Sequence, residues 1–228
     1  MKERLTHLPT EPFTAEREWA VDGIPVLSAS ISLPRPVHRD SRTARRIERY
    51  YRLQCRAYLR YCENFLLPQV TAEYHAALDA SRPLPAVHAR LEHRITWQQD
   101  GLWSLYTQSS ERGLSSTPRL LVRRGDTWDL AAGYPVPLQA FFPDNRCWKK
   151  DLLAAAEAEI LRQEAAGIVR CHDNWRRALR RQFNPQNHYL TEDGLTFFYP
   201  MYAIAPPSAG IPTFTIPYGQ LRLPPERT

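Results

Sequence analysis

The C-terminal segment of this 228-residue chain, residues 188–222, constrains the fold more than any other stretch. It reads HYLTEDGLTFFYPMYAIAPPSAGIPTFTIPYGQLR, an aromatic-rich run that proline and turn-forming residues interrupt repeatedly. Proline is excluded from helix interiors and central strands, and Asp193-Gly194 is a turn signal. The pattern therefore predicts strand structure over residues 195–204 and 213–216, with a turn at residues 206–210.

Upstream, the chain alternates predicted strands with predicted helices. Apolar residues at three- and four-residue steps predict a long helix over about residues 41–66, with Ser41 as its N-cap, and shorter helices over about 147–166 and 173–183, the last capped by Asp173. Strand hairpins are predicted at residues 17–33 and 91–107, and a further strand at 119–128. This order predicts an α+β fold, in which an antiparallel or mixed β-sheet packs against the long helix.

The long helix carries two opposite stripes. One is expected to face the sheet and contains Ile47, Tyr50, Tyr51, Gln54, Tyr58, Tyr61, Cys62 and Phe65. The other is basic and contains Arg42, Arg45, Arg49, Arg52, Arg56 and Arg60. Six like charges on one face repel one another, so we expect them to meet neighbouring carboxylates, a protein partner or phosphates. Pro68 is expected to limit or kink this helix.

Length and composition favour one compact domain. With 43% apolar residues, we expect a single body over residues 17–222 with lobes at about 17–110 and 111–222, and tails at 1–16 and 223–228. The N-terminus lacks the apolar region of a signal peptide, and no stretch approaches the roughly 18 apolar residues of a spanning helix. We therefore expect a soluble cytoplasmic protein, or an extracellular one if the true N-terminus is missing.

The charge balance bears on the type of partner, and the cysteine spacing bears on metal binding. The net charge is +6, and all but three of the 30 basic residues are arginine, a balance that suits either an ordinary basic protein or one with an anionic partner. The cysteines lack the CxxC spacing of a metal site and are expected to be reduced, buried, small apolar side chains: Cys55, Cys62, Cys147 and Cys171.

The C-terminal motif resembles a known family. The positions that carry this resemblance are Asp193, Gly194, Leu195, Phe197, Phe198, Tyr202, Ile204, Ala205, Pro206, Gly210, Phe214, Ile216, Pro217, Tyr218 and Leu221. They are similar to the C-terminal module of a bacterial domain-of-unknown-function family, found in the extracellular part of RsiV anti-sigma factors and in the N-terminal region of PdaC peptidoglycan deacetylases. Weaker similarity extends upstream to about Trp19, which makes the first lobe PdaC-like and the second RsiV-like.

The resemblance implies a sensing or interaction module. For the RsiV type it implies binding of a muramidase, whereas the sigma-binding segment, the membrane helix and the deacetylase domain have no counterpart in this chain. Two departures bear on recognition. Pro207 stands where relatives usually have tyrosine, and the loop at residues 109–118 replaces a Gly-Gly-Ala-His-Gly turn.

The chain contains no recognisable catalytic or metal-binding motif. The histidines do not form HExxH or another ligand pattern: His7, His38, His75, His88, His93, His172 and His188. Glu192 and Asp193 could act as a carboxylate pair, but adjacent residues in a turn point apart. His172-Asp173 is better explained as a helix start than as a base with its orienting carboxylate. We therefore predict no enzyme activity, no cofactor and no metal.

Our leading hypothesis is a non-enzymatic binding or sensing module of the RsiV/PdaC-like type, with a protein or glycan partner. Its candidate surface is Tyr199, Tyr202, Pro206, Pro207 and Tyr218. The alternative is a nucleic-acid-binding protein that uses the basic stripe of the long helix. A third possibility, an unrecognised hydrolase, would depend on residues such as His172 or Asp193.

Overall fold

The computed structural model describes residues 6–38, 40–84, 86–112, 120–142 and 146–220 and confirms the α+β class. The chain divides into two compact units. The first consists of residues 1–94, 107–121 and 131–133, and the second of residues 95–106, 122–130 and 134–228. Segments of the two units therefore alternate along the chain, instead of meeting at a single boundary near residue 110 as predicted. Both strands of the hairpin predicted at residues 91–107 contain residues of each unit.

The first unit begins with a long hairpin of β1 (Thr10–Val21) and β2 (Ile24–Pro36), joined at Asp22-Gly23, where both residues have positive φ. Two expectations are corrected here. The last seven residues of the predicted tail belong to β1, and the hairpin continues past residue 33, so that Pro34 lies inside β2 and Pro36 is its last residue. Proline is tolerated there because β3 pairs only with Leu27–Ile31 of β2.

The larger sheet is mixed and has the strand order β1-β2-β3-β4-β5-β6. Strand β3 (Val87–Gln99) is parallel to β2 and turns at Asp100-Gly101 into β4 (Leu102–Arg112), as predicted. Strands β5 (Leu121–Asp129) and β6 (Tyr134–Pro135) are antiparallel. The predicted loop 109–118 is wrong at its start, because residues 109–112 extend β4; residues 113–118 lie outside the described part of the chain.

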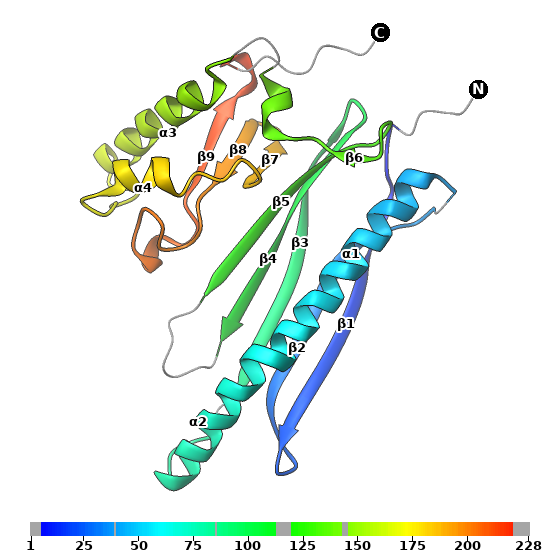
Figure 1. Cartoon of the computed structure of the whole chain (residues 1–228), viewed down its shortest axis with the longest axis vertical. Coiled ribbons are helices and arrows are strands. Elements are labelled where there is room, and N and C mark those ends of the chain that lie inside the picture. Colours follow the sequence, from blue (N-terminus) through cyan, green and yellow to red (C-terminus); the bar gives the residue numbers. More distant parts are fainter. Residues whose placement is uncertain (1–5, 39, 85, 113–119, 143–145, 221–228) are drawn as a thin grey trace. The chain divides into compact units, whose positions relative to one another are not determined.

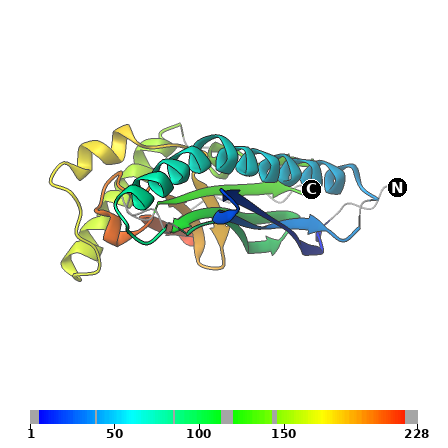
Figure 2. The same cartoon turned by 90° about the horizontal axis from the view of Figure 1, so that it is seen from below.

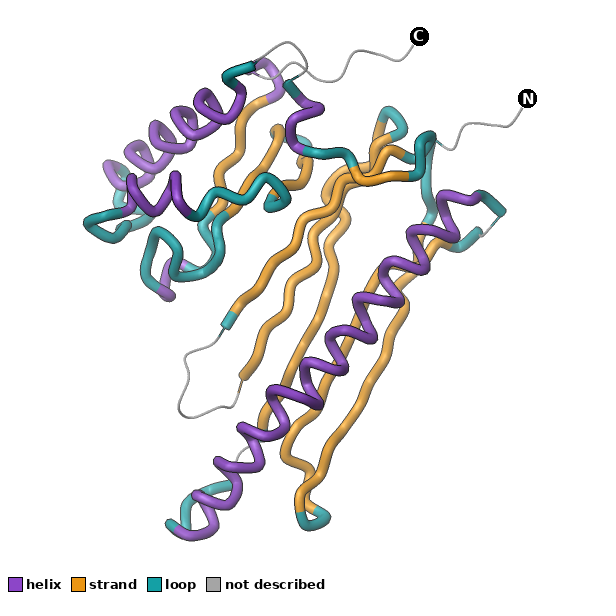
Figure 3. Tube along the Cα trace, in the orientation of Figure 1, coloured by secondary structure: helices purple, strands orange, loops and turns teal. Residues whose placement is uncertain are grey.

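One continuous helical run follows β2 and comprises α1 (Arg42–Tyr61), the π-helical turn η1 (Cys62–Leu66) and α2 (Leu67–Asp79) (Figure 3). As predicted, the Ser41 hydroxyl caps the run by accepting a bond from the Ala44 amide at 2.9 Å. Pro68 neither ends the run nor breaks it. The wider turn immediately before it, closed by a bond from the Leu67 amide to the Cys62 carbonyl, accommodates the proline ring.

Helix α1 lies along β2 in the first unit (Figures 1 and 2). Its predicted apolar face is largely confirmed, because Ile47, Tyr51, Tyr58 and Cys62 are buried. Phe65 is the exception, since 62% of it is exposed. The π turn contains one residue more than an α-helical turn, so the sequence spacing of the buried positions changes at this point.

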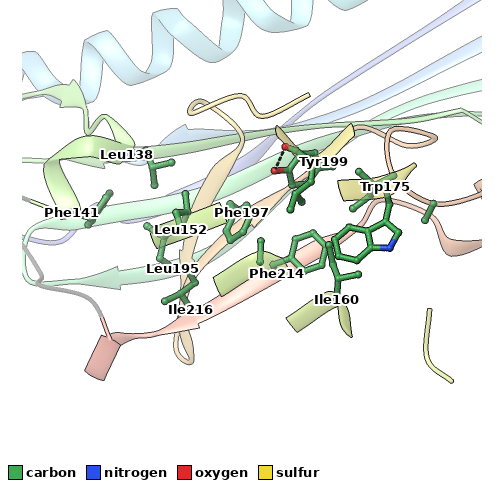
Figure 4. Packing of buried hydrophobic residues seen from close by; sticks show 14 of the residues in the cluster. Leu138, Phe141, Leu152, Ile160, Trp175, Leu195, Phe197, Tyr199, Phe214 and Ile216 are labelled. Carbon is green, nitrogen blue, oxygen red and sulfur yellow. Dashed lines mark hydrogen bonds between the residues drawn. The ribbon is translucent and has the colours of Figure 1, made fainter. Parts of the chain in front are cut away.

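The second unit contains a small antiparallel sheet of β7 (His188–Thr191), β8 (Gly194–Phe198) and β9 (Thr213–Pro217), together with α3 (Trp148–Ala165) and α4 (Trp175–Arg181). Short 3-10 turns occur at Leu138–Phe141, Pro207–Ala209 and Tyr218–Gln220. Side chains from these elements form one hydrophobic core (Figure 4). The predicted strand over residues 195–204 ends at Phe198.

Two close approaches attach β7 to β4 and β5 within this unit. The buried Ser104 hydroxyl on β4 accepts a bond from the Leu190 amide at 2.8 Å and lies 2.7 Å from the Thr127 hydroxyl on β5. At Gly125 on β5, an added Cβ would lie 2.0 Å from the His188 carbonyl oxygen. The unit is therefore assembled through a direct backbone contact that only glycine permits.

The start of α4 differs from the prediction. Its N-cap residue is Asn174, without a side-chain cap, and Asp173 is exposed one residue earlier. A backbone bond from the Trp175 amide to the His172 carbonyl forms the turn instead, so an acidic cap is not required. The glycine after α3, Gly167, has φ 69° and confirms the predicted helix end. Among the helices of the described residues, none is long and apolar enough to cross a membrane.

Candidate functional site

The basic stripe predicted on the long helix is exposed along its whole length. The residues concerned are Arg42, Arg45, Arg49, Arg52, Arg56 and Arg60, all on α1 of the first unit. Arg52 pairs with Glu48 at 2.9 Å. Within the described part of the chain, no carboxylate lies within ion-pair distance of Arg42, Arg49, Arg56 or Arg60. Most of the positive charge of this stripe therefore faces solvent and is not neutralised by carboxylates of neighbouring elements in the described part of the chain.

The surface predicted in the C-terminal segment is only partly a surface. Tyr199 is 1% exposed, and its hydroxyl donates to the Leu179 carbonyl of α4 at 2.8 Å (Figure 4). This corrects the prediction: the phenol can be buried because that carbonyl satisfies its hydroxyl. Tyr218 is half-buried and donates to the Thr191 carbonyl at 2.8 Å. Tyr202, Pro206 and Pro207 remain accessible to solvent.

The accessible residues of that surface lie beside the segment that precedes α4. The His172 amide donates to the Ile204 carbonyl at 3.0 Å, so residues 170–174 run next to residues 202–206. In the sequence, His172-Asp173 and Tyr202 are separate candidates about thirty residues apart. A single hydrogen bond between two irregular segments leaves no local pattern from which it could be predicted.

Two neighbouring cavities open where these segments meet. The larger, about 710 Å³, is lined by Arg170, Cys171, His172, Asp173, Asn174 and Pro206. The smaller, about 300 Å³, is lined by His172, Asn174, Arg177, Ala178, Arg181, Gln182, Tyr202 and Ala203. Because His172 and Asn174 line both, we treat them as one candidate site, called here the double cavity. Both volumes are in the range of ligand-binding cavities.

The four arginines of α4 are divided between two environments. Arg176 lies 2.8 Å from Glu157 of α3, and Arg180 lies 3.9 Å from the same carboxylate. Arg177 and Arg181 line the smaller cavity, and no described carboxylate lies within 4.0 Å of either. They are four residues apart and therefore neighbours on one helix face. The smaller cavity thus has two positive charges that the described structure does not pair.

Tyr202 has an unusual backbone conformation. Its φ is 71°, in the left-handed region, where Asp22, Ser81 and Asp100 also lie. Those three are small polar residues, which tolerate the region, whereas a bulky aromatic residue there is strained. Such strain tends to persist where the side chain has a use, so it marks Tyr202 as a candidate functional residue.

We expect Tyr202→Gly to be more stable than Tyr202→Ala by about 1 kcal/mol. Both variants remove the ring, but only glycine adopts φ 71° without strain, which reverses the usual advantage of alanine. The free energy of unfolding, measured for both variants in urea, checks this. If alanine is the more stable of the two, the backbone at residue 202 is not strained.

Cys171, which lines the double cavity, is not activated as a nucleophile. Burial raises the pKa of Cys171 to about 11, with a further contribution from the charge of Glu164. The thiol therefore stays protonated near neutral pH, and a thiolate is the form that attacks or binds a metal. Cys55 and Cys62 are buried free thiols, as predicted, and burial raises the pKa of both. Cys147 is exposed, contrary to the prediction, because it lies at the N-terminal end of α3.

Other side chains that could act in catalysis or bind a metal ion lie outside the double cavity. The Ser28 hydroxyl lies 2.7 Å from His88 Nδ1 across β2 and β3, a pair that sequence spacing does not reveal. No carboxylate within the described ranges bonds this histidine, so the third member of a catalytic triad is not provided. Glu192 and Asp193 are exposed in the β7–β8 turn. No three His, Cys, Asp or Glu side chains of the described residues are grouped for a metal ion.

Comparison with known proteins places the double cavity inside a matched region. Residues 139–219 match the family described as "Protein of unknown function (DUF3298)". A crystal structure of a DUF3298 family member from Bacteroides fragilis is similar over 94% of this chain and 92% of that one, with a TM-score of 0.65 and 17% identity. One from Pseudomonas aeruginosa is similar over 93% and 92%, with a TM-score of 0.54 and 20% identity. None of the curated proteins searched matches the chain.

Proposed function

We propose that this chain, with its C-terminal region matching DUF3298, is a non-enzymatic binding or sensing module of the RsiV/PdaC-like type. Its partner is a protein or a cell-wall-related ligand, which it holds at the double cavity. The observation that carries the proposal is the pairing of two unneutralised arginines, Arg177 and Arg181, with the strained and exposed Tyr202 at one cavity. Cationic and aromatic side chains are the residue types enriched where proteins bind partners.

The position of the site supports this proposal. All residues that line the double cavity lie between Arg170 and Pro206, within the segment that matches the family. The resemblance to RsiV and PdaC rests on the same segment and includes Tyr202 and Pro206. The described residues around the cavity offer cations, amides and an aromatic ring, but they lack an activated nucleophile, which favours binding over catalysis.

The test uses the whole chain with two probes, purified peptidoglycan sacculi and a purified muramidase. We expect saturable binding to one of them, and we expect Arg177→Gln/Arg181→Gln to weaken it at least about tenfold. The matched control is Arg176→Gln/Arg180→Gln, which removes the same charge from the other face of α4 and should bind like the wild type. Failure of both probes, or equal effects of the two double variants, would overturn the proposal.

The basic stripe of α1 supports a second candidate function, binding of a nucleic acid. Its arginines extend over about 27 Å at a rise of about 1.5 Å per residue, and at least four of them have no described carboxylate partner. Phosphate contacts release counterions, so affinity for a labelled oligonucleotide should fall steeply between about 50 and about 200 mM salt. The absence of binding at low salt would exclude this function. We rank it second because the aromatic side chains of α1 mostly face the sheet, away from a bound strand.

A further inference from the structure

We infer that the double cavity recognises a glycan in which an acidic sugar unit adjoins a neutral one, with the acidic unit in the smaller cavity. This inference rests on the proposed function and specifies its ligand. Four observations support it: the charge of each cavity, the aromatic residue, the side-chain amides, and the residues that the cavities share.

The charges of the two cavities differ. The smaller cavity contains Arg177 and Arg181 and no acidic residue. The larger contains Arg170 and Asp173, one positive and one negative charge, so its net charge is zero. Arginine side chains bind carboxylates, like phosphates, with bidentate bonds, and a carboxylate is the charged group of an acidic sugar. An acidic unit is therefore favoured in the smaller cavity, and a neutral unit in the larger.

The other residues of the smaller cavity suit the body of a sugar. Tyr202 is 38% exposed and offers a rigid ring with a polar tip, against which the apolar face of a pyranose can pack. Asn174 and Gln182 supply amides, each with donors and an acceptor, as the hydroxyls of a sugar require. The small side chains Ala178 and Ala203 leave room for a ring in about 300 Å³.

The shared residues favour a ligand whose two units are linked. His172 and Asn174 line both cavities, so a ligand that fills one cavity reaches the other without leaving these side chains. The hydrogen bond from the His172 amide to Ile204 fixes this junction relative to the Tyr202 loop. A linked pair of sugars gains affinity from both cavities, whereas a single sugar gains it from one.

The experiment measures binding of a hyaluronan tetrasaccharide, in which acidic and neutral sugars alternate, to the whole chain by calorimetry at low salt. We expect it to bind at least about tenfold more tightly than its carboxyl methyl ester, because the ester removes only the charges. Arg177→Gln/Arg181→Gln should lose this difference, and Arg176→Gln/Arg180→Gln should keep it. Tyr202→Gly should weaken binding of the ester as well, since it removes the ring.

Each other outcome overturns the inference. Equal affinity for the acid and its ester would show that the arginine pair does not read a carboxylate. Equal or tighter binding of a tri-glutamate peptide would show that the site recognises acidic peptides instead of sugars. Binding of sacculi or muramidase without any affinity for the tetrasaccharide would leave the proposed function intact and reject this ligand.

Discussion

The variant Gly125→Ala is expected to lose about 3 kcal/mol or more of unfolding free energy, a large part of the stability of an ordinary domain. The added methyl group would lie 2.0 Å from the carbonyl oxygen and 2.7 Å from the carbonyl carbon of His188. Both atoms are backbone, so no side-chain rotation relieves the overlap, and β7 would have to move away from β5. Such a displacement also breaks the bond from the Leu190 amide to Ser104.

Urea denaturation followed by circular dichroism measures this loss. Gly219→Ala is the matched control, because nothing lies within 4 Å of the position of its added methyl group and the residue has no positive φ. We expect it to change stability by less than about 0.5 kcal/mol. A Gly125→Ala protein as stable as this control would show that β7 does not contact β5 through its backbone.

Acidification is expected to destabilise the protein through His188. Burial lowers the pKa of this histidine to about 4, and the carbonyl of Pro185, 3.0 Å from Nδ1, only partly offsets the effect. The unfolded chain, with an ordinary histidine pKa, binds a proton near pH 6.5, whereas His188 in the folded protein stays unprotonated at that pH. The contribution to stability is therefore complete above pH 6.5 and lost as the pH falls toward 4, up to about 3 kcal/mol.

The variant His188→Asn isolates this contribution, because its amide can still donate to the Pro185 carbonyl but does not titrate. The free energies of unfolding of the wild type and the variant are measured from pH 7 to pH 4. Over this range the wild type should lose about 3 kcal/mol relative to the variant. Parallel curves would contradict the prediction. An NMR titration provides an independent measurement, in which the His188 ring should titrate near pH 4 in the folded protein.

Local patterns in the sequence predicted most elements of the fold. Three-residue and four-residue periodicity located the long helix, and Ser41 caps it as expected. Asp-Gly turns located two hairpins, because only certain residues adopt positive φ. The failures have two causes. At the start of α4 a local backbone turn, from the Trp175 amide to the His172 carbonyl, replaces the Asp173 cap, whereas at Tyr199 the distant carbonyl of Leu179 allows the ring to be buried.

The candidate site was less predictable than the fold. Tyr202 and Pro206 were identified from their place in a motif. Nothing in the sequence indicates that Glu157 neutralises Arg176 and not Arg177, because that depends on how α3 packs against α4. The strain at Tyr202 is equally invisible, since aromatic residues are ordinarily placed in extended or helical backbone.

The π turn at Cys62–Leu66 determines where the helical run can change its length. Deleting one residue there would restore the ordinary α-helical period and leave α2 nearly in phase with α1, because the π turn already accommodates one extra residue. Val70, Tyr74 and Ala77, which are buried, would then keep their positions. Elsewhere in the run, an inserted or deleted residue would rotate the following part of the helix by about 100° and misplace these side chains. Related chains whose helical run is one residue shorter are therefore expected to lack that residue between Tyr61 and Leu67.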